Sequence, residues 1–292
     1  MQRLRSGGRV QQLQAANALH GLAARNPEAR AAVCAACAVP VLVQCLSRNG
    51  SSDALLTAAL ATLTILAADA NISSSALQDL TIGMLSAVRL LQHSSSGVQQ
   101  QAALMLGCYA DRGEEHAAAV AASGGIAPLL QQLSSADDMA AGSAAFALGI
   151  LLQSAHDSSQ VRQLKGLLPS KAPDIVRLLC STGANVQLFS AALLIKMFYD
   201  EHAVLSLLTA GGVEALTRLC SSSDARHQQL AAPALAGLAN YSSGVPSRIA
   251  AAGSTTDVQQ ALRCASSNTN LPQEARWAMQ TLADALAGLT SP

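Results

Sequence analysis

Two segments of the sequence decide the fold: SGGIAPLLQQLSS at residues 123–135 and AAFALGILL at residues 144–152. The first is a Gly-Gly break followed by an apolar run that ends in serines. The second carries large apolar residues three apart, at Leu148 and Leu151. Apolar residues at i and i+3 share one face of an α-helix, and paired glycines permit a sharp turn between helices. With a short helix before the Gly-Gly break, each repeat is predicted to consist of a short helix, a turn, a second helix, a turn and a longer third helix with one buried face.

Both segments recur along the chain. The Gly-Gly segment returns as AGGVEALTRLCSS at residues 210–222 and, more loosely, as CAVPVLVQCLS at residues 37–47. The longer-helix segment has seven copies, whose central apolar residues are Leu19, Leu63, Leu106, Leu148, Ile195, Leu235 and Met279. These centres are 44, 43, 42, 47, 40 and 44 residues apart, a period typical of helical solenoids. Because one such unit cannot bury its own apolar face, we expect stacked units that share a continuous core.

The order of helix, GGI or GGV, PLLxxL or ALxxL, and then AAxALxxLA resembles the armadillo repeat family. The resemblance covers nearly the whole chain. It implies an all-α fold, a right-handed α-solenoid superhelix of about seven armadillo-type repeats, with residues 1–292 as a single domain. The first and last repeats look incomplete, so we expect either a fragment of a longer protein or ends that dock onto something else.

The charge balance excludes a general electrostatic partner. Lys plus Arg and Asp plus Glu each number 18, so we expect no nucleic-acid partner. No stretch approaches the roughly 18 uninterrupted apolar residues that cross a bilayer, so we expect no membrane insertion. The charges are unevenly spread: residues 1–48 contain six basic residues and one acidic residue, whereas residues 53–157 contain nine acidic residues and two arginines. The sequence therefore predicts an acidic middle segment.

The candidate chemical groups do not form a catalytic pattern. The six histidines are scattered without paired carboxylates or metal-ligand spacing, and no phosphate-binding loop occurs. We therefore expect no catalytic residue, no cofactor and no metal site, and a protein that is not an enzyme. Cys34 and Cys37 form a CxxC pair in an Ala-rich helix, where we interpret both as small hydrophobic residues, and we interpret Cys220 and the single Trp277 as packing residues. Seven cysteines, an odd number, indicate a reducing intracellular compartment; we expect the cytoplasm, with the nucleus and the cilium left open.

The resemblance also identifies positions to compare with peptide-carrying armadillo proteins. Those members place a Trp two residues before the central residue of the third helix and an Asn two residues after it. Here only Trp277 matches, and no Asn does. The middle copies carry apolar residues at these places instead, and as a hypothesis we assign partner binding to the strip Leu104, Cys108, Phe146, Ile150, Leu193 and Met197. The alternative is that tight packing between repeats buries the strip.

The leading functional prediction is a non-enzymatic protein-binding scaffold or adaptor that uses the concave face of the solenoid. Its protein partner is not identified by the sequence. One alternative is a nucleotide-exchange co-chaperone of the Hsp70 system, because NPEARAAVCAACAVPVLVQCL at residues 26–46 resembles a stretch of that family. Another is the substrate-binding part of a larger armadillo protein, such as a U-box ubiquitin ligase.

Overall fold

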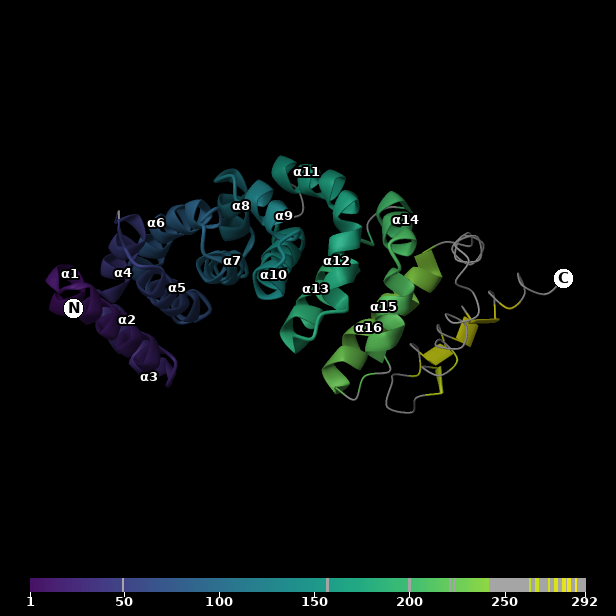
Figure 1. The fold of residues 1–292 in the computed structure, drawn as a ribbon, viewed down its shortest axis with the longest axis horizontal. Helices are drawn as coiled ribbons and strands as arrows, with labels where there is room; N and C mark the ends of the chain where they lie inside the picture. Colours follow the sequence, from purple (N-terminus) through teal and green to yellow (C-terminus); the bar gives the residue numbers. More distant parts are fainter. Residues whose placement is uncertain are drawn as a thin grey trace. The chain divides into compact units, whose positions relative to one another are not determined.

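The computed structural model describes residues 1–48, 50–155, 158–198, 201–220, 222 and 224–241, together with scattered residues between 263 and 287. Every regular element in these ranges is a helix (Figure 1). The chain divides into two compact units, Met1–Gln163 and Leu164–Pro292. The prediction of an all-α solenoid is confirmed, whereas the prediction of a single domain stays a prediction. Met279, the centre of the seventh copy, lies outside the described residues, and only single residues of that copy are described.

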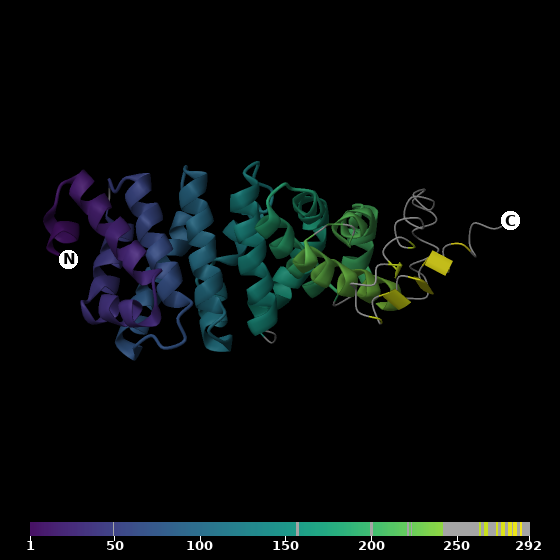
Figure 2. The same ribbon diagram turned by 90° about the horizontal axis from the view of Figure 1, so that it is seen from below.

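Unit 1 is built from stacked helical repeats. Its elements are α1 (Gln2–Ser6), α2 (Arg9–Ala23), α3 (Pro27–Ala35), α4 (Ala38–Ser47), α5 (Asp53–Ala67), α6 (Ser74–Leu90), α7 (Ser96–Ala110), α8 (Glu114–Ala122), α9 (Ile126–Gln132) and α10 (Asp138–Ser154). The long third helices α2, α5, α7 and α10 pack side by side in that order, and α4 packs against α6 in a second layer (Figures 1 and 2). The unit boundary falls within α11 (Ser159–Leu167).

Unit 2 continues the same order of elements. After the 3₁₀ helix at Leu168–Lys171 come α12 (Ala172–Leu179), α13 (Ala184–Lys196), α14 (Glu201–Thr209), α15 (Gly212–Cys220) and α16 (Ala225–Tyr241). The third helices of this unit, α13 and α16, pack against each other, as those of unit 1 do. The predicted alternation of short and long helices is therefore present in both units.

One repeat departs from the predicted three-helix pattern. In residues 74–90 the two expected short helices form the single helix α6. The segment has no Gly-Gly break, because its one glycine, Gly83, serves a close contact instead. A Cβ atom at Gly83 would lie 2.9 Å from Cγ2 of Val43 on α4, so only glycine lets the two helices approach this closely.

In three repeats, the turn between the first two helices contains a left-handed residue. Gly124 and Gly211 have φ angles of 80° and 84°, and both precede the second helix of their repeats. Cys37 holds the same place before α4, with a φ of 52°. The structure therefore confirms that CAVPVLVQCLS aligns with the two Gly-Gly segments.

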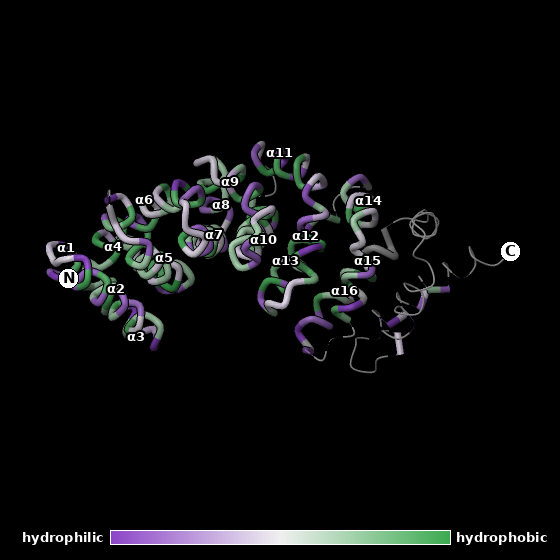
Figure 3. Tube along the Cα trace, in the orientation of Figure 1, coloured by the Kyte–Doolittle hydropathy of each residue, from purple (hydrophilic) through white to green (hydrophobic). Residues whose placement is uncertain are grey.

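The core consists of small and branched apolar side chains. Ala102, Leu106 and Tyr109 on α7 are buried. The equivalent residues of α10, which are Ala144, Leu148 and Leu151, are buried too. Figure 3 shows α10 mostly in the green of hydrophobic residues. Within the described part of the chain, no single helix has the length and apolar composition to cross a membrane, although the bent pair α3–α4 together meets that requirement.

Candidate functional site

A repeated turn fixes the register of the third helices. Before each of four third helices, a side chain accepts a hydrogen bond from the main-chain N–H two residues later, in the pairs His93–Ser95, Ser135–Asp137, Ser181–Gly183 and Ser222–Asp224. In three of these turns, a Gln side chain in the helix donates back to the turn carbonyl at 2.6–2.7 Å. Such local bonds satisfy backbone groups at the helix start. The regular spacing of these glutamines is visible in the sequence and is a signal for the register that apolar spacing does not contain.

The glutamines correct one repeat centre. Gln99 and Gln228 lie seven residues before the central residues Leu106 and Leu235, whereas Gln187 lies seven residues before Leu194. The centre of this copy is thus Leu194 and not Ile195. The error arose because residues 193–195 are all apolar, so hydrophobicity alone does not fix the phase.

The shifted register changes two of the proposed site residues. Leu193 and Met197 on α13 are both fully buried, so the prediction that they lie on an accessible strip is wrong. The places that they were meant to fill belong to Ala192, which is half-buried, and Lys196, which is exposed. The apolar strip therefore does not extend onto α13.

The other four proposed residues lie on adjacent helices of unit 1. Leu104 and Cys108 on α7 and Phe146 and Ile150 on α10 are all half-buried. Ala61 and Ile65 hold the same places on α5 and are half-buried too. The third-helix face, as we name this set, comprises Ala61, Ile65, Leu104, Cys108, Phe146 and Ile150. It is a partly accessible apolar surface over three helices that pack side by side.

The helices α7 and α10 pack closely at the third-helix face. A Cβ atom at Gly107 would lie 2.5 Å from the Phe146 ring, so this glycine lets the ring of α10 lie against α7. Burial raises the pKa of the Cys108 thiol from 9.0 to about 11, with Asp111 contributing in the same direction. Cys108 is therefore a protonated, packing thiol near neutral pH.

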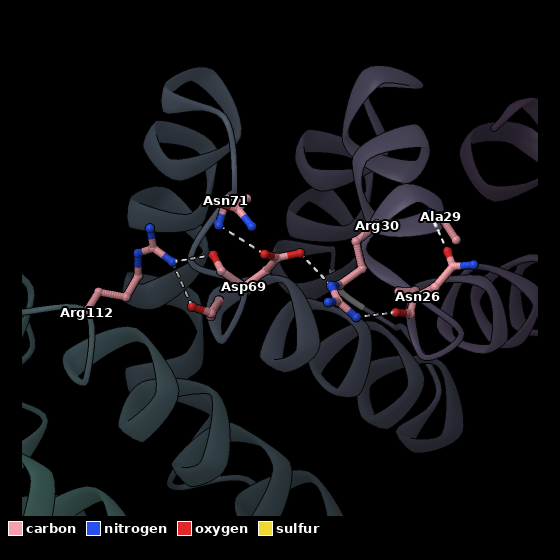
Figure 4. Close-up of polar contacts among 8 residues, drawn as sticks. Asn26, Ala29, Arg30, Asp69, Asn71 and Arg112 are labelled. Carbon is pink, nitrogen blue, oxygen red and sulfur yellow. Dashed lines mark hydrogen bonds and ion pairs between the residues drawn. The ribbon is translucent and has the colours of Figure 1, made fainter.

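A polar network joins three repeats at the carboxyl ends of α2 and α5 (Figure 4). Arg30 on α3 donates to the carboxylate of Asp69, and it also donates to the carbonyl of Ala23 at 3.4 Å. Arg112 donates to the main-chain carbonyls of Ala67 and Asp69 at 3.0 and 2.8 Å. The hydrogen bond from Arg30 lowers the pKa of the Asp69 carboxyl. The network holds the carbonyl ends of α2 and α5, which have no partner within their own helices.

The CxxC pair lies beside the same network. Cys34 is half-buried, and Cys37 is exposed and follows α3 rather than lying within it. The interpretation of both as packing residues is wrong for Cys37. Both line a cleft of about 300 Å³ that also contains Arg30 and Asp69. Among the described residues, no cluster of three or more His, Cys, Asp or Glu could hold a metal ion.

Two further sequence predictions have opposite outcomes. Cys220 is fully buried, which confirms its packing role, and burial raises its thiol pKa to about 12. Trp277 is 65% exposed, so its interpretation as a packing residue is wrong.

The chain is similar in structure to engineered and designed repeat proteins. The crystal structure of one engineered protein covers 98% of this chain and 67% of its own, with a TM-score of 0.73 and 28% sequence identity. A designed armadillo repeat protein in complex with the peptide (KR)4 covers 85% of this chain and 99% of its own, with a TM-score of 0.63 and 20% identity. A structure of computationally designed armadillo repeat proteins for modular peptide recognition gives the same values. No protein-family model and no curated protein matches the chain.

Proposed function

We propose that this chain, an armadillo-type α-solenoid, is a non-enzymatic scaffold that binds a protein partner on the third-helix face of unit 1. The partner segment that fits this face best is an amphipathic helix with an apolar stripe and basic residues along its edges. The observation that carries the proposal is the accessible apolar surface itself.

The third-helix face has the composition of a docking surface. Its six side chains are apolar and half-buried, and they come from three helices that pack side by side. Contiguous apolar surface that stays accessible in a folded chain commonly marks a protein-binding site. Helix-in-groove recognition uses such a surface through apolar anchors at i, i+3, i+4 and i+7 of the bound helix.

The charges around the face favour a basic partner. Asp53 at the start of α5, Asp111 at the end of α7, and Glu114 and Glu115 in the first turn of α8 are all exposed. Asp111 also stands where the α7 dipole presents its negative end, which strengthens the attraction for a cation. Complementary charge at a rim mainly steers association and selects partners.

The structural comparisons support a peptide ligand in general terms. A designed armadillo protein of similar fold binds the peptide (KR)4, which is strongly basic. In this chain the equivalent helices carry apolar residues where peptide-carrying armadillo proteins place Trp and Asn. Apolar contacts do not hold an extended backbone in register, whereas they match the stripe of a helix. The proposal therefore specifies a helical partner segment rather than an extended one.

The test compares two double variants, each of which replaces two apolar residues by glutamine. Leu104→Gln with Ile150→Gln changes the third-helix face, whereas Ile82→Gln with Leu85→Gln changes two exposed apolar residues of α6 as a matched control. The probes are a fluorescent amphipathic helical peptide of Leu and Lys and its Leu and Glu counterpart. Binding is measured by fluorescence anisotropy at low and high salt, with circular dichroism as the check of folding.

We expect the Leu and Lys peptide to bind the unaltered chain, more weakly at high salt because rim charges are screened. The variant of the third-helix face should lose at least tenfold in affinity, and the α6 control should keep it. Equal losses in both variants, or equal binding of the Leu and Glu peptide, would remove the third-helix face as the binding site.

A further inference from the structure

A second surface feature of unit 1 lies between the segment after α6, the first turn of α7, and α9 with the turn that follows it. It is a cleft of about 550 Å³, within the size range of ligand sites in proteins. Its polar lining consists of Gln92, Gln99, Gln131, Gln132, Ser134 and Ser135. No Asp, Glu, Lys or Arg lines it, so the cleft is polar and uncharged.

Gln132 is the anomalous residue of this cleft. It is the last residue of α9 and only 4% exposed, yet both its side-chain oxygen and its side-chain nitrogen have no hydrogen-bond partner. A buried polar group without a partner destabilises a fold, so a native one requires an explanation. Gln99, which lines the same cleft, differs because its amide donates to the His93 carbonyl at 2.7 Å.

The fold itself does not need a polar residue at this place. Aligned on the residue that follows it, Gln132 corresponds to Leu90, Leu178 and Leu219 in three other repeats. Leu178 and Leu219 are buried, as expected for a core position at the end of a second helix. Leucine would therefore fit the solenoid at this position, and packing alone does not account for the carboxamide of Gln132.

We propose that Gln132 and its cleft bind a main-chain amide at the end of a bound helical segment, where N–H and C=O groups have no partner within the helix. A carboxamide offers one acceptor and one donor group, and a peptide main chain offers the complementary C=O and N–H. A charged ligand would find no counter-charge in the lining, which favours a neutral ligand. That the amide comes from a protein rests on the proposed function, because Gln99 of the cleft lies on α7, which also carries part of the third-helix face.

The probe for this site is N-acetylglycine N-methylamide, which is a main-chain amide without a side chain. The control ligand is N-acetylsarcosine dimethylamide, which has a similar shape and no N–H donor. Nuclear magnetic resonance follows the side-chain NH₂ signal of Gln132, assigned by its loss in Gln132→Leu. Gln78→Leu, at an exposed place on α6 outside the cleft, is the matched control variant.

We expect a saturable shift of the Gln132 signal with the first ligand, at millimolar concentrations, and none with the second. Gln132→Leu should raise the melting temperature by about 2 to 8 °C, because it removes an unpartnered amide. No saturable shift, or the same shift with both ligands, would overturn the proposal, and so would a destabilised Gln132→Leu variant. A stabilised variant without any probe binding would mean that the cleft holds solvent only, which also overturns it.

This experiment separates the present proposal from the proposed function. The double variant Leu104→Gln with Ile150→Gln should leave the shift of Gln132 unchanged, because neither residue lines the cleft. If this double variant loses binding of the helical peptide and keeps the shift of the Gln132 signal, the result supports both proposals. A failed helix-binding test with an intact Gln132 response would remove only the third-helix face.

Discussion

Replacing Cys37 by glycine should stabilise unit 1. Cys37 has a left-handed φ of 52°, where two other repeats place glycine. An L-residue loses about 1–2 kcal/mol in this conformation relative to the right-handed one, whereas glycine loses about 0.5–1 kcal/mol through its freer unfolded state. Because the Cys37 side chain is exposed, its removal sacrifices little packing. The net expectation is a gain of about 0.5–1 kcal/mol, or roughly 1–4 °C in melting temperature.

The measurement is urea unfolding followed by circular dichroism, with the midpoint compared at an unchanged m-value. Cys37→Ser is the matched control, since it removes the thiol and keeps the Cβ atom, and we expect it to leave the midpoint unchanged. Gly124→Ala is the reciprocal change: its φ is 80° and no atom lies within 4 Å of the added Cβ. We expect this variant to lose about 1 kcal/mol from backbone strain alone.

A Cys37→Gly variant less stable than the unaltered chain would refute the argument. The same conclusion would follow if Cys37→Ser gained as much stability as Cys37→Gly, since the gain would then come from the thiol. If Gly124→Ala left stability unchanged, the left-handed turn would not be a constraint of the repeat.

Three other outcomes follow from single contacts. Asp69→Asn should lower the free energy of unfolding by about 1–3 kcal/mol at pH 7, because Arg30 keeps no anionic partner. Since the pKa of Asp69 is lowered, its stabilising effect is lost as pH falls below about 4, and the urea midpoints of the variant and the unaltered chain should converge there. Burial raises the pKa of Cys108 to about 11, so its stabilising effect is present below pH 9 and is lost as pH rises through 11. Unfolding measured from pH 8 to 11 should show a loss of about 2 kcal/mol that Cys108→Ala lacks. Gly107→Ala should lose about 1–3 kcal/mol in thermal unfolding because its Cβ would displace the Phe146 ring, and an unchanged melting temperature would contradict this contact.

The candidate site shows where hydrophobic periodicity is sufficient and where it fails. The spacing of Leu106 and Leu148 predicted that Leu104, Cys108, Phe146 and Ile150 share a face, and the structure leaves all four half-buried. The same reasoning failed for Leu193, because the run of apolar residues around it permits two helical phases. The polar contact of Gln187 with the turn carbonyl selects one phase, and it adds a signal that apolar spacing does not contain.

The cleft of Gln132 was beyond sequence reasoning for a different reason. A glutamine near the end of an apolar helix reads as a surface residue, since most glutamines are exposed. Its burial results from neighbouring elements that pack around it, and these come from other parts of the chain. The alignment of Cys37 with glycine in the sequence already indicated a left-handed turn there, because backbone conformation depends on nearby residues more than side-chain burial does.

The sequence by itself determined that the chain is an all-α armadillo-type solenoid and where its third helices lie. Helix periodicity and repeat length are local properties, written into residues a few positions apart. Tertiary structure alone decided which apolar side chains remain accessible, that Arg30, Asp69 and Arg112 meet across repeats, and that Gln132 is buried without a partner. These features depend on how closely adjacent repeats approach, and that distance is set by side chains about one repeat apart in the sequence.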